Sequence, residues 1–282
     1  MLGRIVVLAA LALCGAATPA PAQWPNVTLG QFIDAFNAKS QLAVAALIAD
    51  TATIRVSDNN CNTQTKQQFL QGIASWFAST SAVDVYPQSR PIVTAHTGVI
   101  RLRETAFMTA AFGTPQEWQN NDVVLVVRTT ADGRQLEQLD FMTRAVGAHN
   151  NNAAQIALLD QLFAAEQRGD ANAYLALLSP AAVMEVHQGN TGVLTKFNHT
   201  ALVANIKFTF GYQTSLQVLL DRSATFTTPC NVIVAVGQKQ VVGLDNSTCV
   251  SHFVTGVFVD TATSKVTYID RFADAKPWAA CF

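Results

Sequence analysis

Two apolar stretches in the second half of the chain carry side chains that could perform acid–base chemistry. Tyr268, Asp270 and Phe272 alternate along the strand-like run 265–272, so they share one face of a strand. Glu185 and His187 share a face of the run 182–187 in the same way. Proton abstraction beside a carbonyl group, or dehydration, needs a base with a pKa near neutrality and a donor for the developing oxyanion. We therefore expect Asp270 or His187 to be the base and Tyr268 the donor, with Glu185 and Phe272 contacting a ligand.

The same side chains also have a structural interpretation. Asp270 would then bond backbone groups or Arg271, His187 would be solvated, and Tyr268 would pack in a core with its hydroxyl at the rim. His252, in the run 249–260, is a further candidate ligand-binding residue. A histidine at the end of a strand more often satisfies local hydrogen bonds.

The strand with Asp270 is the second copy of an earlier segment. A shift of 130 residues places 266–272 on 136–142, and the same shift, without a gap, places 175–186 on 45–56. Unrelated apolar segments rarely agree at two distant places, so we expect two copies of one domain. Asp140 is the first-copy counterpart of Asp270 and another candidate ligand-binding residue. Gln138 replaces Tyr268, however, which makes the first copy the weaker candidate for catalysis.

Each copy is predicted to place helices before most of its strands. In the first copy, apolar spacing predicts helices at 28–36, 41–49 and 66–78, with a strand at 51–56 before the third helix. Strands at 92–94, 99–109, 123–130 and 135–144 are predicted to follow. The second copy repeats this order, with predicted helices at 153–168, 171–178 and 194–210 and a strand at 182–187 before the third helix. Strands at 214–220, 230–237, 249–260 and 265–272 follow. The asparagine-rich residues 147–152 are the predicted linker between domains at 23–146 and 153–282.

The helix end Gln167-Arg168-Gly169-Asp170-Ala171, the passage 177–186 and the closing strand with Asp270 and Phe272 carry a family resemblance. Each copy resembles the cone-shaped α+β family of nuclear transport factor 2, ketosteroid isomerase and the SnoaL-like polyketide cyclases. The resemblance implies two cone-shaped α+β barrel domains, each with three N-terminal helices packed against a strongly curved antiparallel sheet. The first copy departs from the pattern, because Lys39-Ser40 replaces Gly-Asp and Met142 replaces the closing Phe.

Composition limits the classes of partner. The 282 residues are 50% hydrophobic and 13% charged, with a net charge of -1 and no basic run, so two cores can form and nucleic acid is an improbable partner. Arg4, the apolar run 5–13 and Ala20-Pro21-Ala22 form the pattern of a secretory signal spanning 1–22. That run is too short to cross a bilayer, so we expect an exported soluble protein with no membrane partner.

Four cysteines remain after removal of the signal, an even number that favours disulfides in an oxidising compartment. Cys230 and Cys249 open neighbouring strand-like runs and are predicted to pair, which leaves Cys61 with Cys281 by elimination. No C-x-x-C and no nearby pair of histidines is present, so no metal site is predicted.

Three sequons, at Asn26, Asn198 and Asn246, are possible glycosylation sites.

These features support three hypotheses. The first is a secreted tandem SnoaL-like protein whose second domain holds a small apolar or carbonyl-bearing molecule in its cone pocket. The second is an isomerase, dehydratase or cyclase that needs no cofactor and uses Asp270 as its base. The third is a non-catalytic structural or dimerisation module. In each case the fused copies would form an intramolecular pseudo-dimer, so the chain would be monomeric.

Overall fold

The computed structural model describes residues 26–57, 61–88, 92–93, 96–108, 118–145, 152–188, 193–243 and 248–274. The predicted signal peptide, residues 147–151 of the predicted linker, Asn246 and Cys281 lie outside these ranges. The domain boundary therefore stays a prediction.

Each half of the chain contributes helices and one sheet. The elements of the first half are α2 (Asn26–Asn37), α3 (Gln41–Leu47), β1 (Ile48–Ser57), β2 (Asn62–Gln64), α4 (Lys66–Ser79), β3 (Thr80–Pro87), β4 (Ile92–Val93), β5 (Thr97–Met108), β6 (Trp118–Thr129) and β7 (Leu136–Ala145). Those of the second half are α5 (Ala153–Gln167), α6 (Ala171–Ala176), β8 (Leu178–Gln188), β9 (Val193–Phe197), α7 (His199–Tyr212), β10 (Gln213–Leu220), β11 (Phe226–Thr227), β12 (Val232–Gly243), β13 (Thr248–Asp260) and β14 (Lys265–Ala273).

The two halves form separate α+β units, as predicted. The first sheet has the order β2-β1-β7-β6-β5-β3 with β4 on β5, and the second has β10-β12-β13-β14-β8-β9 with β11 on β12. Both sheets are mixed rather than purely antiparallel, because β1 runs parallel to β7 and β8 runs parallel to β14. Arg55 pairs with Asp140 and Glu185 pairs with Asp270, so the 130-residue repeat is kept in the strand register.

Strand β9 corrects one expectation. Residues 194–197 were assigned to the start of the third helix of the second copy, but they pair with β8 as an edge strand, and α7 begins at His199. The run Val193–Phe197 contains the β-branched residues Val193 and Thr195 and the aromatic residue Phe197, which favour a strand.

The turn between the first two helices is built similarly in both copies. Lys39 and Gly169, which are 130 residues apart, both have positive φ angles, of 50° and 64°. The following residues are N-caps: Ser40 accepts a hydrogen bond from the backbone N–H of Ala43, and Asp170 accepts one from that of Ala173. The Lys39-Ser40 departure therefore leaves the turn intact, because a lysine adopts the left-handed conformation that glycine takes more readily.

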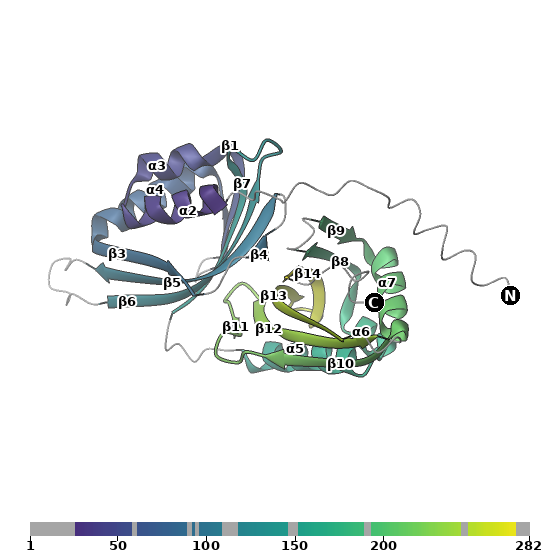
Figure 1. The fold of residues 1–282 in the computed structure, drawn as a ribbon. Helices are drawn as coiled ribbons and strands as arrows, with labels where there is room; N and C mark the ends of the chain where they lie inside the picture. The colour runs from purple at the N-terminus through teal and green to yellow at the C-terminus, as the bar shows by residue number, and fades with distance from the viewer. Residues whose placement is uncertain are drawn as a thin grey trace.

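Three groups of buried side chains hold the molecule together. One lies between the helices and the sheet of the first half, and a second lies between those of the second half. The third joins the two sheets, and its members are Val99, Val124, Val126 and Met142 from the first sheet and Phe226, Val232, Val234, Val254 and Phe272 from the second. In Figure 1 the helices of each half lie on the side of their sheet that faces away from the other half.

A disulfide also connects the halves, but not the predicted one. Cys230 bonds to Cys61, 169 residues earlier. The expected Cys230–Cys249 pair is wrong because β12 and β13 are antiparallel: Cys249 lies opposite Val241, whereas Cys230 precedes the far end of β12. The predicted Cys61–Cys281 pair is also wrong, since Cys61 is already bonded to Cys230. Cys249 is disulfide-bonded as well.

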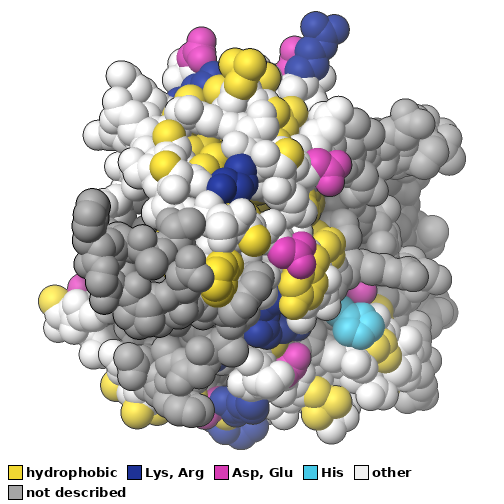
Figure 2. Space-filling view, turned by 90° about the vertical axis from the view of Figure 1, so that its left-hand side faces the viewer, with side chains coloured by type: hydrophobic (Ala, Val, Ile, Leu, Met, Phe, Trp, Pro, Cys, Tyr) yellow, Lys and Arg dark blue, Asp and Glu magenta, His cyan; other side chains and the backbone are white. Residues whose placement is uncertain are grey.

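The described surface agrees with the low charge of the sequence. On the face drawn in Figure 2, acidic and basic side chains are interspersed with apolar ones. Within the described ranges, no helix has the length and hydropathy needed to span a membrane.

Candidate functional site

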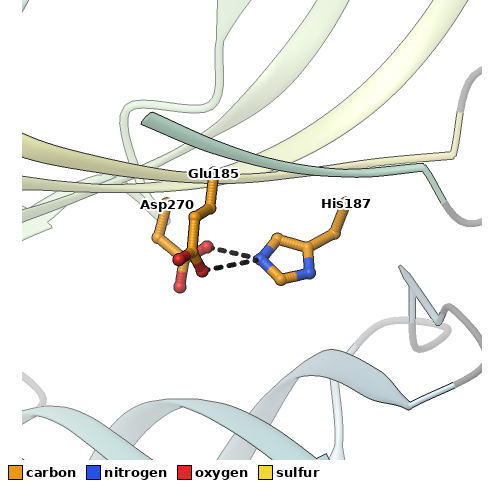
Figure 3. Close-up of side chains that lie close together, drawn as sticks. All are labelled: Glu185, His187 and Asp270. Atoms are coloured by element: carbon orange, nitrogen blue, oxygen red, sulfur yellow. Dashed lines mark hydrogen bonds and ion pairs between the residues drawn. The ribbon is translucent and has the colours of Figure 1, made fainter. Parts of the chain in front are cut away.

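Strands β8 and β14 bring the predicted acids and imidazole together. In their parallel register Glu185 lies beside Asp270, and His187 lies beside Phe272. Nε2 of His187 is 2.8 Å from Oδ1 of Asp270 and 3.9 Å from Oε2 of Glu185. Figure 3 shows the three side chains leaving the sheet on the same side and converging. The sequence therefore identified a real cluster.

The face of the sheet that carries this cluster is not the expected one. Met184 and Ile269, which alternate with the cluster residues, pack in the core against the helices. Phe272 instead belongs to the group of side chains between the two sheets. Strand alternation correctly grouped the side chains, but it could not tell which face the helices cover. The cluster therefore faces the first domain, not the interior of the second cone.

Contacts from the first domain close over the cluster. Nδ1 of His187 is 2.8 Å from Oγ1 of Thr97, and the imidazole stacks on Phe272 with ring centroids 4.1 Å apart. Thr97, His187 and Asp270 thus follow one another in the order of a hydrolase triad. Their exposed fractions are only 3%, 1% and 5%, so the three side chains are enclosed between the two sheets.

The charges around the cluster are largely compensated. Burial is the main reason that the pKa of Asp270 is raised, and His187 partly opposes this effect. Burial would also raise the pKa of Glu185, but hydrogen bonds from Lys196 and Tyr268 and the nearby charges outweigh it and lower that pKa. The pKa of Tyr268 is raised, first by burial and then by the charges of Asp270 and Glu185.

Glu185, His187 and Asp270 carry atom types that bind divalent cations, and their ligand atoms lie within 4.8 Å of one another. Both oxygens of Glu185 already have cationic partners, however, with Lys196 at 2.7 Å and Arg128 at 3.3 Å. A metal ion would have to displace or repel these side chains. The arrangement is better described as an ion-pair network between the domains.

Two further predicted ligand-binding residues, Asp140 and His252, lie outside this cluster. Asp140 accepts two hydrogen bonds from Arg55, at 2.7 and 2.6 Å, and one from Gln138 at 2.8 Å. This first-domain group faces the cluster, since the charge of Asp140 helps to raise the pKa of Asp270. His252 lies apart from both groups, exposed and 3.0 Å from Asp274.

Of the predicted sequon asparagines, Asn198 is exposed and caps α7 through the backbone N–H of Ala201. Asn26 is the first residue of α2, and its side chain is not among those described.

The interior of the second cone contains a polar group that sequence reasoning missed. Glu166 of α5 forms an ion pair with Lys239 of β12, and Nη1 of Arg271 lies 3.3 Å from the same Oε1 atom. Tyr174 of α6 lies close enough to Arg271 that each affects the pKa of the other. Only 12% of the Lys239 and Arg271 side chains and 9% of the Glu166 side chain are exposed. We call Glu166, Tyr174, Lys239, Thr255 and Arg271 the cone cluster.

Several buried atoms of the cone cluster lack hydrogen-bond partners among the described residues. They include Nε and Nη2 of Arg271 and Oγ1 of Thr255. Thr255 is 0% exposed and lies directly opposite Arg271 in the β13–β14 ladder. Directly paired residues have Cβ atoms about 5 Å apart, so one acceptor could contact both side chains. Unpartnered buried donors are rare in folded proteins and call for a specific reason.

The first cone has apolar residues at the corresponding repeat positions. A shift of 130 residues relates Glu166, Tyr174, Thr255 and Arg271 to Phe36, Val44, Leu125 and Phe141. Leu125 pairs with Phe141 as Thr255 pairs with Arg271, so the comparison holds in the strand register. All four belong to the first-domain core or pack against it. The first domain therefore packs apolar side chains at the four positions where the second domain has polar ones.

An alignment of the two copies at the 130-residue offset therefore contains the signal for four of the five cone-cluster residues. The fifth, Lys239, matches Glu104 by strand register, since Lys239 pairs with Ser251 and Glu104 with Asn121. Here the separation is 135 residues rather than 130, so a comparison at constant offset does not find it.

Several solved structures are similar to part of the chain. The BvnE pinacolase from Penicillium brevicompactum matches 46% of this chain and 88% of its own, at 12% identity and a TM-score of 0.39. A putative SnoaL-like polyketide cyclase from Shewanella denitrificans matches 44% and 92%, at 14% identity and 0.38. An NTF2-like protein from Exiguobacterium matches 42% and 98%, at 18% identity and 0.35. No protein-family model and no curated protein matches the chain.

Each of these three structures matches less than half of the chain. Their descriptions differ in activity. Function therefore has to be derived from the residues of this chain rather than from its fold.

Proposed function

We propose that the second domain binds a small molecule that carries a carbonyl or carboxylate group on an apolar frame. The observation that carries the proposal is the pair of buried, unpartnered donors on Thr255 and Arg271. Leaving a buried donor unpaired costs on the order of 1–3 kcal/mol, and a ligand oxygen that accepts from both would offset that cost. The rings of Phe163 and Phe253 lie in the same core and would contact the apolar frame.

The position of the cone cluster supports access from solvent. Lys239 and Arg271 each keep 12% of the side chain exposed, so the cluster reaches the edge of the cone rather than its sealed centre. A buried ionic group is rarely retained for stability alone, since apolar side chains of similar volume often serve as well or better. The four apolar counterparts in the first domain illustrate that alternative.

We infer that the first domain is a structural partner within an intramolecular pseudo-dimer. Support comes from the apolar contact between the two sheets, from the disulfide between Cys61 and Cys230, and from the buried network around His187. The disulfide also favours an oxidising compartment, in line with export of the chain. Asp270 contributes to this interface, so the geometry supports a structural role for it rather than that of a catalytic base.

Binding can be tested by isothermal titration calorimetry with hexanoate as the probe, since it combines a carboxylate with a short apolar chain. We expect one binding site per chain. Arg271→Leu should weaken binding by about tenfold or more, because a hydrogen bond to a charged group contributes about 1.5–3 kcal/mol. Native mass spectrometry of the purified chain would report any small molecule carried from the cell.

The matched control is Phe141→Leu, which changes the corresponding position of the first cone. It should leave hexanoate binding unchanged. Two outcomes oppose the proposal: equal binding by the parent and by Arg271→Leu, or an equal loss of binding in both variants. Thermal unfolding of each variant establishes that the fold is kept.

A further inference from the structure

We propose that Lys239 is a nucleophile that forms a Schiff base with the carbonyl group of an aldehyde or ketone ligand. This inference rests on the ligand site proposed above and adds a reaction to it. It assigns the carbonyl-bearing class of ligand to a specific atom, Nζ of Lys239, and gives the other members of the cone cluster defined roles.

The surroundings of Nζ are apolar on two sides and ionic on the third. The atom lies 5.5 Å from the ring centroids of both Phe163 and Phe253. Oε1 of Glu166 contacts Nζ, and the same oxygen lies 3.3 Å from Nη1 of Arg271. Lys239 therefore shares one carboxylate with a second cation and has little water around it. A desolvated lysine beside another cationic group is a known arrangement for activating an amine.

The electrostatic consequence is a larger neutral fraction of the amine. Burial, followed by the positive charge of Arg271, lowers the pKa of Lys239 from 10.5 to about 8, and Glu166 only partly opposes this change. The pKa of Glu166 itself is lowered, because Arg271 and Lys239 together outweigh the effect of burial. The carboxylate is thus ionised and able to accept a proton, while the lysine can lose one near pH 8.

The proposed reaction balances without an oxidant or a reductant. The Nζ lone pair forms a bond to the carbonyl carbon, and the π electrons of the C=O bond move to oxygen. Glu166 accepts a proton from nitrogen and returns it to the oxygen, which gives the carbinolamine. It then transfers the second N–H proton to the hydroxyl group, which leaves as water while the nitrogen lone pair forms the C=N bond. Arg271, which shares Oε1 of Glu166 with Nζ of Lys239, would hydrogen-bond the oxygen while it carries negative charge.

The test is reductive trapping on the full chain with its disulfides intact. The protein is incubated with hexanal and cyanoborohydride, which reduces the imine to a stable secondary amine, and peptide mass spectrometry locates the added hexyl group. We expect Lys239 to be labelled about tenfold faster than the exposed Lys207 near neutral pH. Each unit of pKa depression raises the neutral fraction tenfold and lowers the intrinsic nucleophilicity by less.

Two measurements on the parent chain make the test decisive without a substitution at Lys239. Hexanoate should protect Lys239 of the parent chain from labelling without protecting Lys207, and the labelling rate of Lys239 should rise with pH and level off above about 8. The titratable groups that face Lys239 are Glu166 and Arg271, and the arginine keeps its charge throughout this range.

The outcomes separate this inference from the ligand site itself. Hexanoate binding together with equal labelling of Lys239 and Lys207 would overturn the Schiff-base role and leave the binding site standing. Failure of hexanoate to bind, combined with uniform labelling, would remove both. Preferential labelling that hexanoate blocks supports both together.

Discussion

Replacement of Thr255 by valine tests the central observation directly. Valine has nearly the same shape and replaces the unpartnered hydroxyl by a methyl group. Thr255 is 0% exposed and its Oγ1 has no hydrogen-bond partner among the described residues. A buried hydroxyl in that state costs about 1–3 kcal/mol, so Thr255→Val should raise the free energy of unfolding by about 1 kcal/mol or more. For a chain of this size each kcal/mol corresponds to about 2–4 °C in Tm.

The same substitution should weaken hexanoate binding, so stability and binding are expected to move in opposite directions. Thr97→Val is the matched control, because Thr97 is also buried but its hydroxyl contacts Nδ1 of His187 at 2.8 Å. That variant should be less stable than the parent. Denaturant titration and calorimetric melting measure both effects. A Thr255→Val chain that is less stable than the parent would show that the hydroxyl is satisfied and would refute the reasoning.

Three further predictions concern the two faces of β14, the disulfide and pH. Asp270→Asn should change stability but leave hexanoate binding within about twofold, whereas Arg271→Leu at the next position abolishes most of it; equal losses in calorimetry would contradict the assignment of faces. Double substitution of Cys61 and Cys230 by serine should lower the free energy of unfolding by about 2–5 kcal/mol in urea titration, while small-angle scattering stays unchanged because the apolar contact remains. The pKa of Lys239 is about 8 in the folded chain and 10.5 for a free lysine, so the unfolded chain binds more protons between these pH values. The contribution of Lys239 to stability should therefore rise with pH in this range and be lost as the pH falls through about 8. A Lys239→Met chain whose stability has the same pH dependence as the parent would oppose this prediction.

The repeat was the most informative feature of the sequence. Its 130-residue offset recurs in the strand register, where Arg55 pairs with Asp140 as Glu185 pairs with Asp270. Alternation along the strands also grouped Asp270 with Glu185 and His187. Both signals are local properties of the chain, because they depend only on spacing along a strand and between copies.

The parts that were missed depend on contacts between distant elements. Whether Asp270 or Arg271 faces the helices is decided by which side of the sheet packs against α5 and α6, and both alternating sets on β14 mix apolar and polar residues. The partner of Cys230 was missed because the interface between the domains brings Cys61 to it. Arg271 was considered only as a partner of Asp270, because a charged residue on a strand is usually exposed.

The difference between the two cones has a consequence for how such a chain can change. In an assembly of identical subunits, one codon alters both cores at once, so every buried charge is introduced twice and every resulting loss of stability is doubled. Fusion of the copies removes that coupling. Phe36 and Phe141 can keep one core dry and firmly packed while Glu166 and Arg271 place ions in the other. The stable core of the first domain can thus compensate for the buried charges of the second. A homodimer of either half would have either two apolar cores or two cores with buried charges.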